Sequence, residues 1–337
     1  MTLDEIEKKI IDNPDPKTLF GGNVDAELKK FHTACHPDRF AGNPLLSSRA
    51  EIIFKKLGVL ADEAKKPSIA IRSGERSYNL TRILGIGDIA DVHLGICDGQ
   101  EYVIKISRVP EGVEMLDQEQ TAVGKMMKDA GITNYVQYIP RFIESFLVRD
   151  KIQKRINVYK YQPGFYTLEE VHAKFPRGLE EKHLAWIFKR LLVATGFAHR
   201  CGIIHGSILP CHIQINAKNH GLQLIGWGQS VGMGGKITSG PSNYMNWFPD
   251  EVKKKRKASS STDIFMAAKC MVYLAGGDPA KSHETPTLQP KMARFIRSCL
   301  MEGQSMRPED AWVLHDEFND ILQGMYDLKN FHHLTME

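Results

Sequence analysis

The spacing of apolar residues divides the chain into a helical first part and a mixed second part. Near the start, Leu3, Ile6 and Ile10 recur at intervals of three and four residues, which is typical of one face of an α-helix. Thr2 and Glu5 have the spacing of a capping box, so this helix is expected to begin directly after Thr2. The pattern predicts helices over most of residues 1–66 and strands from about residue 78.

Two further helices are predicted on either side of the tripeptide His-Pro-Asp at 36–38. Asp25 is placed to cap the first of them, and the proline disfavours helical geometry at the residue before it, so this helix should end there. Asn43 and Pro44 have the character of an N-cap and a first helical residue. The residues expected to face inward from the last helix are Ala50, Ile53, Phe54, Leu57, Ala61 and Ala64. The tripeptide is therefore expected in an exposed loop between antiparallel helices.

A polar stretch over 68–77 follows these helices and is predicted to be a linker. Three segments beyond it, "YNLTRIL", "ADVHLGI" and "EYVIKIS", alternate or run apolar and predict strands. Asp98-Gly99 is typical of a hairpin turn between the second and third of these strands. Helices dominate later, including the nearly all-apolar "DIFMAAKCMVYLAGG". The predicted fold class is α+β, with an all-α N-terminal domain before a domain of two lobes.

Composition fits a soluble globular protein. The chain has 337 residues, 42% hydrophobic and 25% charged, and its net charge of +4 gives no global electrostatic reason to expect a nucleic-acid partner. The first residues are acidic and amphipathic, unlike a secretory signal, and the apolar run around Lys269 is too short to span a bilayer. Six scattered cysteines without a CxxC pair predict free thiols. A cytoplasmic location without a membrane partner is expected.

The tripeptide at 36–38, set between two helices, resembles that of a J domain, the module that activates the ATPase of seventy-kilodalton heat-shock chaperones. The resemblance covers about residues 1–67. It implies a chaperone-binding set formed by His36, Pro37, Asp38, Lys29, Lys30 and Arg39. The alternative is a plain helical hairpin in which the tripeptide is only a turn.

The segment from about 78 to 320 resembles a protein kinase in the order and spacing of its motifs. The resemblance places Gly85 and Gly87 in a glycine-rich phosphate loop, and it pairs Lys105 of the next strand with Glu119 of the following helix. In kinases this lysine contacts the phosphates of ATP. These four residues are therefore the candidates for contact with a nucleotide.

The same resemblance implies a bilobal domain over 78–325. The small lobe is expected at 78–160, the large lobe at 161–325 and a C-terminal tail at 326–337. Four residues fall on framework positions of the large lobe. They correspond to the histidine of the catalytic loop, a buried aspartate, and a glutamate and an arginine that are expected to form an ion pair. They are His205, Asp263, Glu251 and Arg307.

The positions at which a kinase carries its chemistry hold other residue types. Ser207 replaces the aspartate that accepts the substrate proton, and Leu209 replaces the catalytic-loop lysine. His212 replaces the asparagine and Gly226 the DFG aspartate, which together hold magnesium. Because the base and both protein ligands of the metal are lost, the resemblance implies a pseudokinase with no catalytic residue and no metal site.

The resulting hypothesis is a co-chaperone-like adaptor. Its J domain would recruit a heat-shock chaperone ATPase, and its kinase-like domain would bind a client or partner protein. Lys105 and Glu119 predict at most a weak affinity for ATP that does not depend on magnesium, because Val103 and Gln214 replace the residues that usually flank the adenine. One alternative is an atypical ATP-dependent kinase or another nucleotide-dependent transferase. A second alternative is a structural assembly protein.

Overall fold

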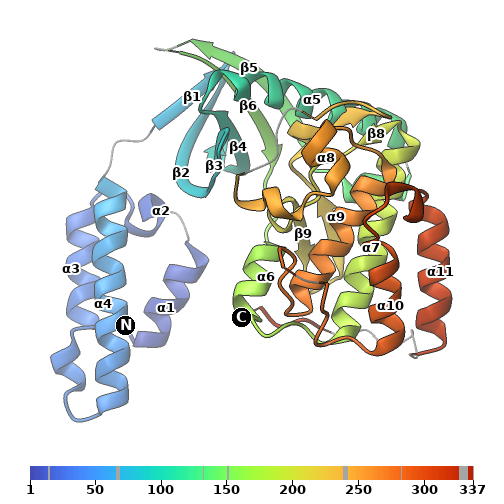
Figure 1. Cartoon of the computed structure of the whole chain (residues 1–337). Coiled ribbons are helices and arrows are strands. Elements are labelled where there is room, and N and C mark those ends of the chain that lie inside the picture. Colours follow the sequence, from blue (N-terminus) through green and yellow to red (C-terminus); the bar gives the residue numbers. More distant parts are fainter. Residues whose placement is uncertain are drawn as a thin grey trace. The chain divides into compact units, whose positions relative to one another are not determined.

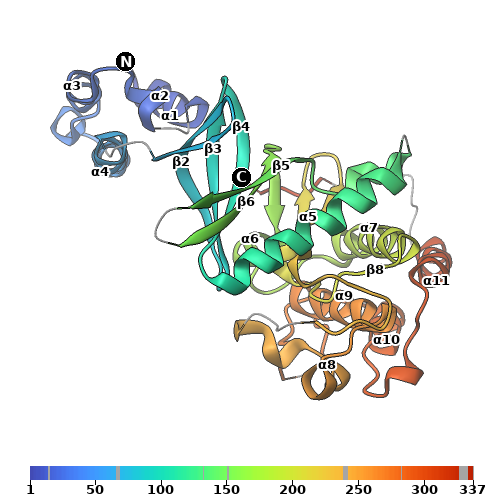
Figure 2. The ribbon, with the colours of Figure 1, turned by 90° about the horizontal axis from the view of Figure 1, so that it is seen from above.

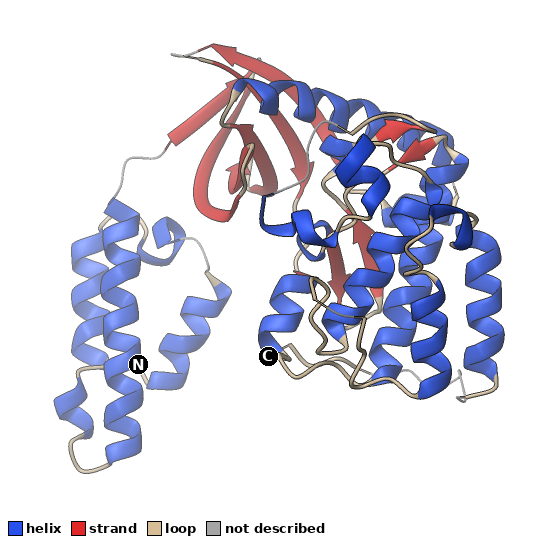
Figure 3. Cartoon of the chain, viewed as in Figure 1, coloured by secondary structure: helices blue, strands red, loops and turns tan. Residues whose placement is uncertain are grey.

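The computed structural model contains both helices and antiparallel strands, in agreement with the predicted α+β class (Figure 3). The chain forms two compact units, Met1–Gly85 with His93–Tyr102, and Ile86–Val92 with Val103–Glu337. The residues that the structure describes are 1–13, 16–65, 69–131, 133–149, 152–237, 242–281, 283–325 and 333–336. Most of the predicted tail at 326–337 and the first residue of the predicted linker, 68, lie outside these ranges.

The first unit begins with helices joined by short turns. Their bounds are α1 Leu3–Asp12, α2 Pro16–Phe20, α3 Val24–Ala34 and α4 Pro44–Lys65, with a 3₁₀ turn, η1, over Pro37–Phe40 (Figure 1). The capping box of Thr2 and Glu5 is present. The predicted cap of α3 is wrong, because the side chain of Asn23 accepts the capping hydrogen bond, from the Ala26 N–H. Asp25 lies in the first turn instead, where its negative charge faces the positive end of the helix dipole.

Helices α3 and α4 pack against each other over a small apolar core. The inward face predicted for α4 is confirmed: Ala50, Ile53, Leu57, Ala61 and Ala64 are buried, and Phe54 is half-buried. Phe31 of α3 meets Phe20 of α2 edge to face, with the ring centroids 5.9 Å apart. Burial of these side chains is the main force that holds such short helices together, since isolated helices of this length are marginal in water.

The linker predicted over 68–77 is wrong where the structure describes it. Ile69–Ser73 forms strand β1, which pairs antiparallel with β2, Arg76–Ile86. Gly74 adopts φ +56° in the two-residue turn between them. Pairing of Ile69 with Leu80 and of Ile71 with Tyr78 fixes the register. Serine, arginine and glycine in this stretch suggested a linker, but they belong to an edge strand and its turn, where polar residues are common.

Four more strands complete a six-stranded sheet in the order β1-β2-β3-β4-β6-β5. Their bounds are β3 Ala90–Cys97, β4 Gln100–Ser107, β5 Phe142–Arg149 and β6 Gln153–Lys160. The predicted turn at Asp98-Gly99 is confirmed, because it joins β3 to β4 and both residues have positive φ, 50° and 70°. Within the second unit, helix α5 (Pro110–Ala130) packs against β6 and β5 (Figure 2).

Helices and short strands make up the rest of the second unit. The helices are α6 Leu168–Lys174, α7 Glu181–Arg200, α8 Asp250–Lys255, α9 Ser260–Leu274, α10 Pro290–Ser298 and α11 Ala311–Gln323. The strands are β7 Phe165–Thr167, β8 Ile203–Ile204, β9 Ile213–Asn216, β10 Gly221–Leu224 and β11 Val231–Gly232. They form a three-stranded sheet, β10-β9-β7, and a two-stranded sheet, β11-β8.

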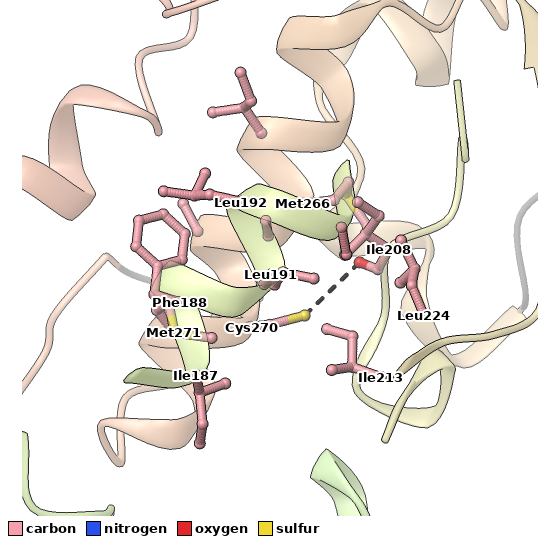
Figure 4. Close-up of a cluster of buried hydrophobic side chains, with 14 of the residues drawn as sticks. Ile187, Phe188, Leu191, Leu192, Ile208, Ile213, Leu224, Met266, Cys270 and Met271 are labelled. Atoms are coloured by element: carbon pink, nitrogen blue, oxygen red, sulfur yellow. Dashed lines mark hydrogen bonds between the residues drawn. The ribbon is translucent and has the colours of Figure 1, made fainter. Parts of the chain in front are cut away.

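The core of the second unit lies where α7 and α9 meet the segment that leads into β9 (Figure 4). Phe188, Leu191 and Leu192 of α7 pack there with Met266 and Met271 of α9. The Cys270 thiol lies 3.7 Å from the Ile208 carbonyl oxygen and donates to it. Ile208 and Ile213 anchor the backbone of residues 205–213 in this core. That segment includes the candidate residues His205, Ser207, Leu209 and His212.

Within the part of the chain that the structure describes, none of the helices combines the length and the apolar character that crossing a membrane requires. The cysteines are free thiols; Cys211 is half-buried and the other five are buried.

Candidate functional site

A buried ion pair joins strand β4 to helix α5. The ammonium group of Lys105 lies 2.9 and 2.6 Å from the two carboxylate oxygens of Glu119. Glu119 is almost fully buried and shares the inner face of α5 with Val123 and Met126, which explains why the helix presents this carboxylate inward. Lys105 keeps a fifth of its side-chain area exposed. The expected pairing is present, and it leaves one face of the lysine accessible to an anion.

The glycines of the predicted phosphate loop offer little to such an anion. The Gly87 amide donates to the Ala90 carbonyl oxygen at 3.0 Å, and its own carbonyl accepts from Arg108 at 3.1 Å. This amide is therefore not available to a phosphate oxygen. Gly85 lies on β2, and a Cβ added there would meet nothing within 4 Å, so close packing does not require glycine at this position.

Asp263 of α9 holds the loop that follows β8. Its carboxylate oxygens accept from the backbone amides of His205 and Gly206, at 2.8 and 2.9 Å. The expected contact of Asp263 with this backbone is therefore present. His199 at the end of α7 also contacts the carboxylate, through Nε2 at 2.9 Å. The only sign of this third partner in the sequence is the position of His199 in the last turn of a predicted helix.

His205 is a buried structural residue. Its Nε2 lies 2.9 Å from the Ile225 carbonyl oxygen, and its Nδ1 accepts from the Ser207 amide at 3.2 Å. These contacts assign the proton to Nε2. Burial lowers the pKa of His205, and its ring packs at 4.4 Å from that of Trp227. A neutral imidazole that uses both nitrogens for the backbone has no capacity left for a substrate.

Ser207 does not form a nucleophilic or proton-accepting pair. Its side chain is fully buried, and its hydroxyl has no hydrogen-bond partner among the described residues. The nearby imidazole of His212 contacts the Ser207 carbonyl oxygen, through Nδ1 at 2.7 Å, rather than the hydroxyl. A base must reach the proton that it removes, and this one is directed at the backbone. Leu209 is also buried, in the core.

His212 and Gly226 lie against each other. Gly226 adopts φ +79°, and a Cβ added to it would lie 2.3 Å from Cδ2 of His212. Burial, followed by the effect of His205, lowers the pKa of His212 to about 3, so the ring is neutral at neutral pH. Magnesium requires oxygen ligands, which neither residue supplies. The described residues contain no group of three or more His, Cys, Asp or Glu side chains that could hold a metal ion, and these positions do not fit magnesium.

A second ion pair lies in the large helical part. Arg307 approaches both carboxylate oxygens of Glu251 at 2.8 Å, which confirms the expected salt-bridge distance. The arginine side chain is completely buried, and its guanidinium lies 4.9 Å from the Phe265 ring centroid. The pair ties the start of α8 to the segment before α11.

The tripeptide at 36–38 in the first unit occupies the turn η1 between α3 and α4. His36 caps this turn by accepting from the Asp38 amide at 3.4 Å, and both side chains are exposed. Lys29, Lys30 and Arg39 are also exposed. Arg39 donates to the Thr33 carbonyl oxygen, which holds its guanidinium near the end of α3. His36 and Asp38 are thus exposed as expected, whereas Pro37 is half-buried.

Comparisons with known proteins gave distant matches to protein kinases. The chain is 26% identical over 147 residues to CBL-interacting protein kinase 16 of Oryza sativa subsp. japonica, a match that covers 42% of this chain and 30% of that protein. It is 22% identical over 204 residues to the serine/threonine-protein kinase tricornered of Drosophila pseudoobscura pseudoobscura. This match covers 56% of this chain and 42% of that protein. No family model matches the chain. The matches thus span less than half the length of each relative, and they support a kinase-like domain within this chain.

Proposed function

We propose that this chain is a binding protein with a kinase-like domain that does not transfer phosphate and a J-domain-like helical unit that recruits a chaperone ATPase. The observation that carries the first half is the contact between Gly226 and His212. The two positions that would hold the metal are occupied by a glycine without room for a side chain and by a neutral imidazole. Phosphoryl transfer depends on a metal that neutralises the charge developing on the phosphate.

The proton-accepting position supports the same proposal. Ser207 carries no charge, and the imidazole of His212 is directed at its carbonyl oxygen rather than at its hydroxyl. Loss of the base and loss of the metal ligands act on one transition state, so neither can compensate for the other. We therefore assign no catalytic residue. The folded framework around Lys105, Asp263 and Glu251 then serves to present a surface to a client or partner protein.

The second half of the proposal concerns the turn at 36–38. Its exposed imidazole and carboxylate lie on a surface with basic side chains at 29, 30 and 39, and this basic charge suits an acidic partner. On the resemblance of this turn to that of a J domain, we propose a seventy-kilodalton heat-shock chaperone as that partner. Asp38 lies outside the helical core beneath the turn, so its substitution should change binding rather than folding. The His36 ring, in contrast, meets Phe54 of that core edge to face, with the centroids 5.6 Å apart.

Chaperone stimulation tests this half. The full chain is expected to accelerate ATP hydrolysis by such a chaperone, and Asp38→Asn is expected to abolish the acceleration. Asp62→Asn is a matched control, because it removes an exposed carboxylate from α4 of the same unit. An unchanged chaperone rate with wild-type protein, across several chaperones, would instead favour a structural assembly protein.

A nucleotide-dependent transferase is the second candidate, and the Lys105–Glu119 pair favours it. This pair leaves the lysine partly exposed, as a phosphate-binding lysine must be. A phosphotransfer assay with ATP, several divalent metals and generic protein substrates separates the candidates. Transfer above background that disappears in Lys105→Ala would establish the transferase and overturn the proposal.

A further inference from the structure

A cavity in the second compact unit shares no residue with the candidate site. Its volume is about 600 Å³, within the range of about 300–1,000 Å³ that is usual for small-molecule sites. Residues from the end of α5, the 3₁₀ turn η2 (Asn134–Tyr138), β7, α7 and β10 line it. Because η2 packs against α5, α7 and β10, the elements that enclose the cavity hold one another in place.

The charges that line this cavity are all positive. Arg141 and Arg190 contribute guanidinium groups, and its lining contains no aspartate or glutamate. Arg190 donates to the Tyr138 hydroxyl at 2.9 Å, and within the described residues neither arginine forms an ion pair. The pKa of Lys189, the neighbour of Arg190 on α7, is lowered by burial and then by the charge of Arg190. Uncompensated guanidinium groups favour a carboxylate or a phosphate.

A buried amide faces the same space. Gln223 of β10 is only 6% exposed and lines the cavity. Its backbone pairs with Gln214 of β9, but its side chain forms no hydrogen bond with any described residue. Its amide, on the wall of the cavity, supplies a donor and an acceptor for a hydrogen bond with a bound ligand. Three further side-chain amides line the cavity, so hydrogen bonding to a ligand is available from several directions.

One wall of the cavity is apolar. Phe165, Ile139 and Pro140 contribute to it, and Val136 is 46% exposed there. His220, at the rim, has φ +55°, an unusual conformation for a residue other than glycine, and its ring stacks on Trp186 at 4.1 Å. Strained backbone of this kind persists where the surroundings hold it, and it is frequent at ligand sites.

We propose that this cavity binds a small organic anion, a phosphate or carboxylate group carried on an aromatic or apolar body. Arg141 and Arg190 hold the anionic group, Gln223 donates to it or to a neighbouring oxygen, and the body lies against Phe165 and Val136. Arg190 keeps its contact with the Tyr138 hydroxyl, which positions the guanidinium before the ligand arrives. The site is independent of phosphoryl transfer and of the turn at 36–38.

Titration of the full chain with phenyl phosphate tests the proposal, with inorganic phosphate and benzyl alcohol as comparison ligands. Calorimetry should detect phenyl phosphate binding, weaker binding of inorganic phosphate and none of the neutral alcohol. Arg141→Gln and Arg190→Gln should each weaken the binding of phenyl phosphate about tenfold or more, because a hydrogen bond to a charged group contributes about 1.5–3 kcal/mol. Gln223→Leu should weaken it by a smaller factor.

Two control variants locate the binding. Arg294→Gln removes an exposed arginine of α10 that does not line the cavity, and it should leave the affinity unchanged. Lys105→Ala removes the anion-accessible lysine of the other site and so shows whether phenyl phosphate binds there instead. Binding that is lost in Lys105→Ala but kept in Arg141→Gln would overturn the proposal. Equal affinity for phenyl phosphate and benzyl alcohol, or no binding of either, would overturn it too.

Discussion

The imidazole of His212 occupies the space that any side chain at Gly226 would need. The 2.3 Å approach of a Cβ at position 226 to Cδ2 of His212 is shorter than any ordinary contact between these atoms. The two substitutions relative to a kinase are therefore physically coupled: with histidine at 212, only glycine fits at 226. An aspartate introduced at 226 alone is therefore blocked by the His212 ring.

This coupling predicts a non-additive pair of substitutions. Gly226→Asp alone should destabilise the second unit by about 2–4 kcal/mol, from steric overpacking and from a positive φ at a residue other than glycine. Combined with His212→Asn, which shortens the facing side chain, the same change should cost at least about 1 kcal/mol less than the sum of the single effects. All four tryptophans lie between residues 186 and 312, so tryptophan fluorescence during urea unfolding reports on this unit.

Gly234→Asp separates the two causes of that loss. Gly234 has φ +73°, close to the value at Gly226, but a Cβ there would meet nothing within 4 Å. Its substitution should therefore show only the conformational cost, about 1–2 kcal/mol. If Gly226→Asp and Gly234→Asp destabilise equally, the contact with His212 has no energetic consequence and the argument from it fails.

The pair of Glu251 and Arg307 predicts a large loss of stability when one partner is removed. Glu251→Gln leaves the completely buried guanidinium of Arg307 without its counter-charge, and such a change typically costs about 3–5 kcal/mol. Urea unfolding followed by tryptophan fluorescence measures it. Asp250→Asn, which removes the adjacent carboxylate and its exposed pair with Lys254, is the control and should have little effect. A loss for Glu251→Gln as small as that of the control would show that the pair does not stabilise the framework.

The low pKa of His212 predicts a loss of stability on acidification. The ordinary value is 6.5 and the value in the folded chain is about 3, so between these limits the unfolded chain binds a proton that the folded chain does not. Stability is therefore complete above about pH 6.5 and falls as the pH falls, by up to about 1.4 kcal/mol per pH unit for this group. The measurement is urea unfolding at pH 7.5, 6.5, 5.5 and 4.5.

Two variants test whether His212 causes this dependence of stability on pH. His212→Asn should reduce the dependence on pH between 6.5 and 4.5. Leu209→Ala removes a buried neighbour of the loop and should lower stability at every pH, by about 2–5 kcal/mol, while it keeps the slope. A slope that is unchanged in His212→Asn would assign the acid sensitivity to other groups, of which buried His205 is the first to test.

Structural features that depend on residues close together in the sequence could be predicted from the sequence. The capping box at Thr2, the inward face of α4 and the turn at Asp98-Gly99 depend on spacing and on turn chemistry, and the structure has each of them. The pairs Lys105–Glu119 and Glu251–Arg307 followed from motif order, although their partners lie 14 and 56 residues apart.

Other features could not be read from the sequence, because they depend on tertiary contacts. Strand β1 has only alternating Ile69 and Ile71 as a signal, and its pairing with β2 decides its structure. The direction of the His212 ring toward the Ser207 carbonyl oxygen, rather than toward the hydroxyl, depends on packing around Gly226. The cavity near Arg141 and Arg190 joins residues of five separate elements, which no local pattern connects.

The partly exposed face of Lys105 predicts how the chain should respond to ATP. A lysine whose charge is already neutralised by Glu119 at 2.6 Å attracts phosphate only weakly, and neither His212 nor Gly226 supplies a side-chain oxygen to recruit magnesium. Any binding of ATP should therefore have the same affinity in magnesium chloride as in EDTA. Lys105→Ala should abolish it. Lys160→Ala is the matched control, because it also removes a half-buried lysine from a strand of the sheet. Tenfold tighter binding in magnesium than in EDTA would mean that the chain supplies a metal site after all, and the proposed loss of phosphoryl transfer would then no longer follow from His212 and Gly226.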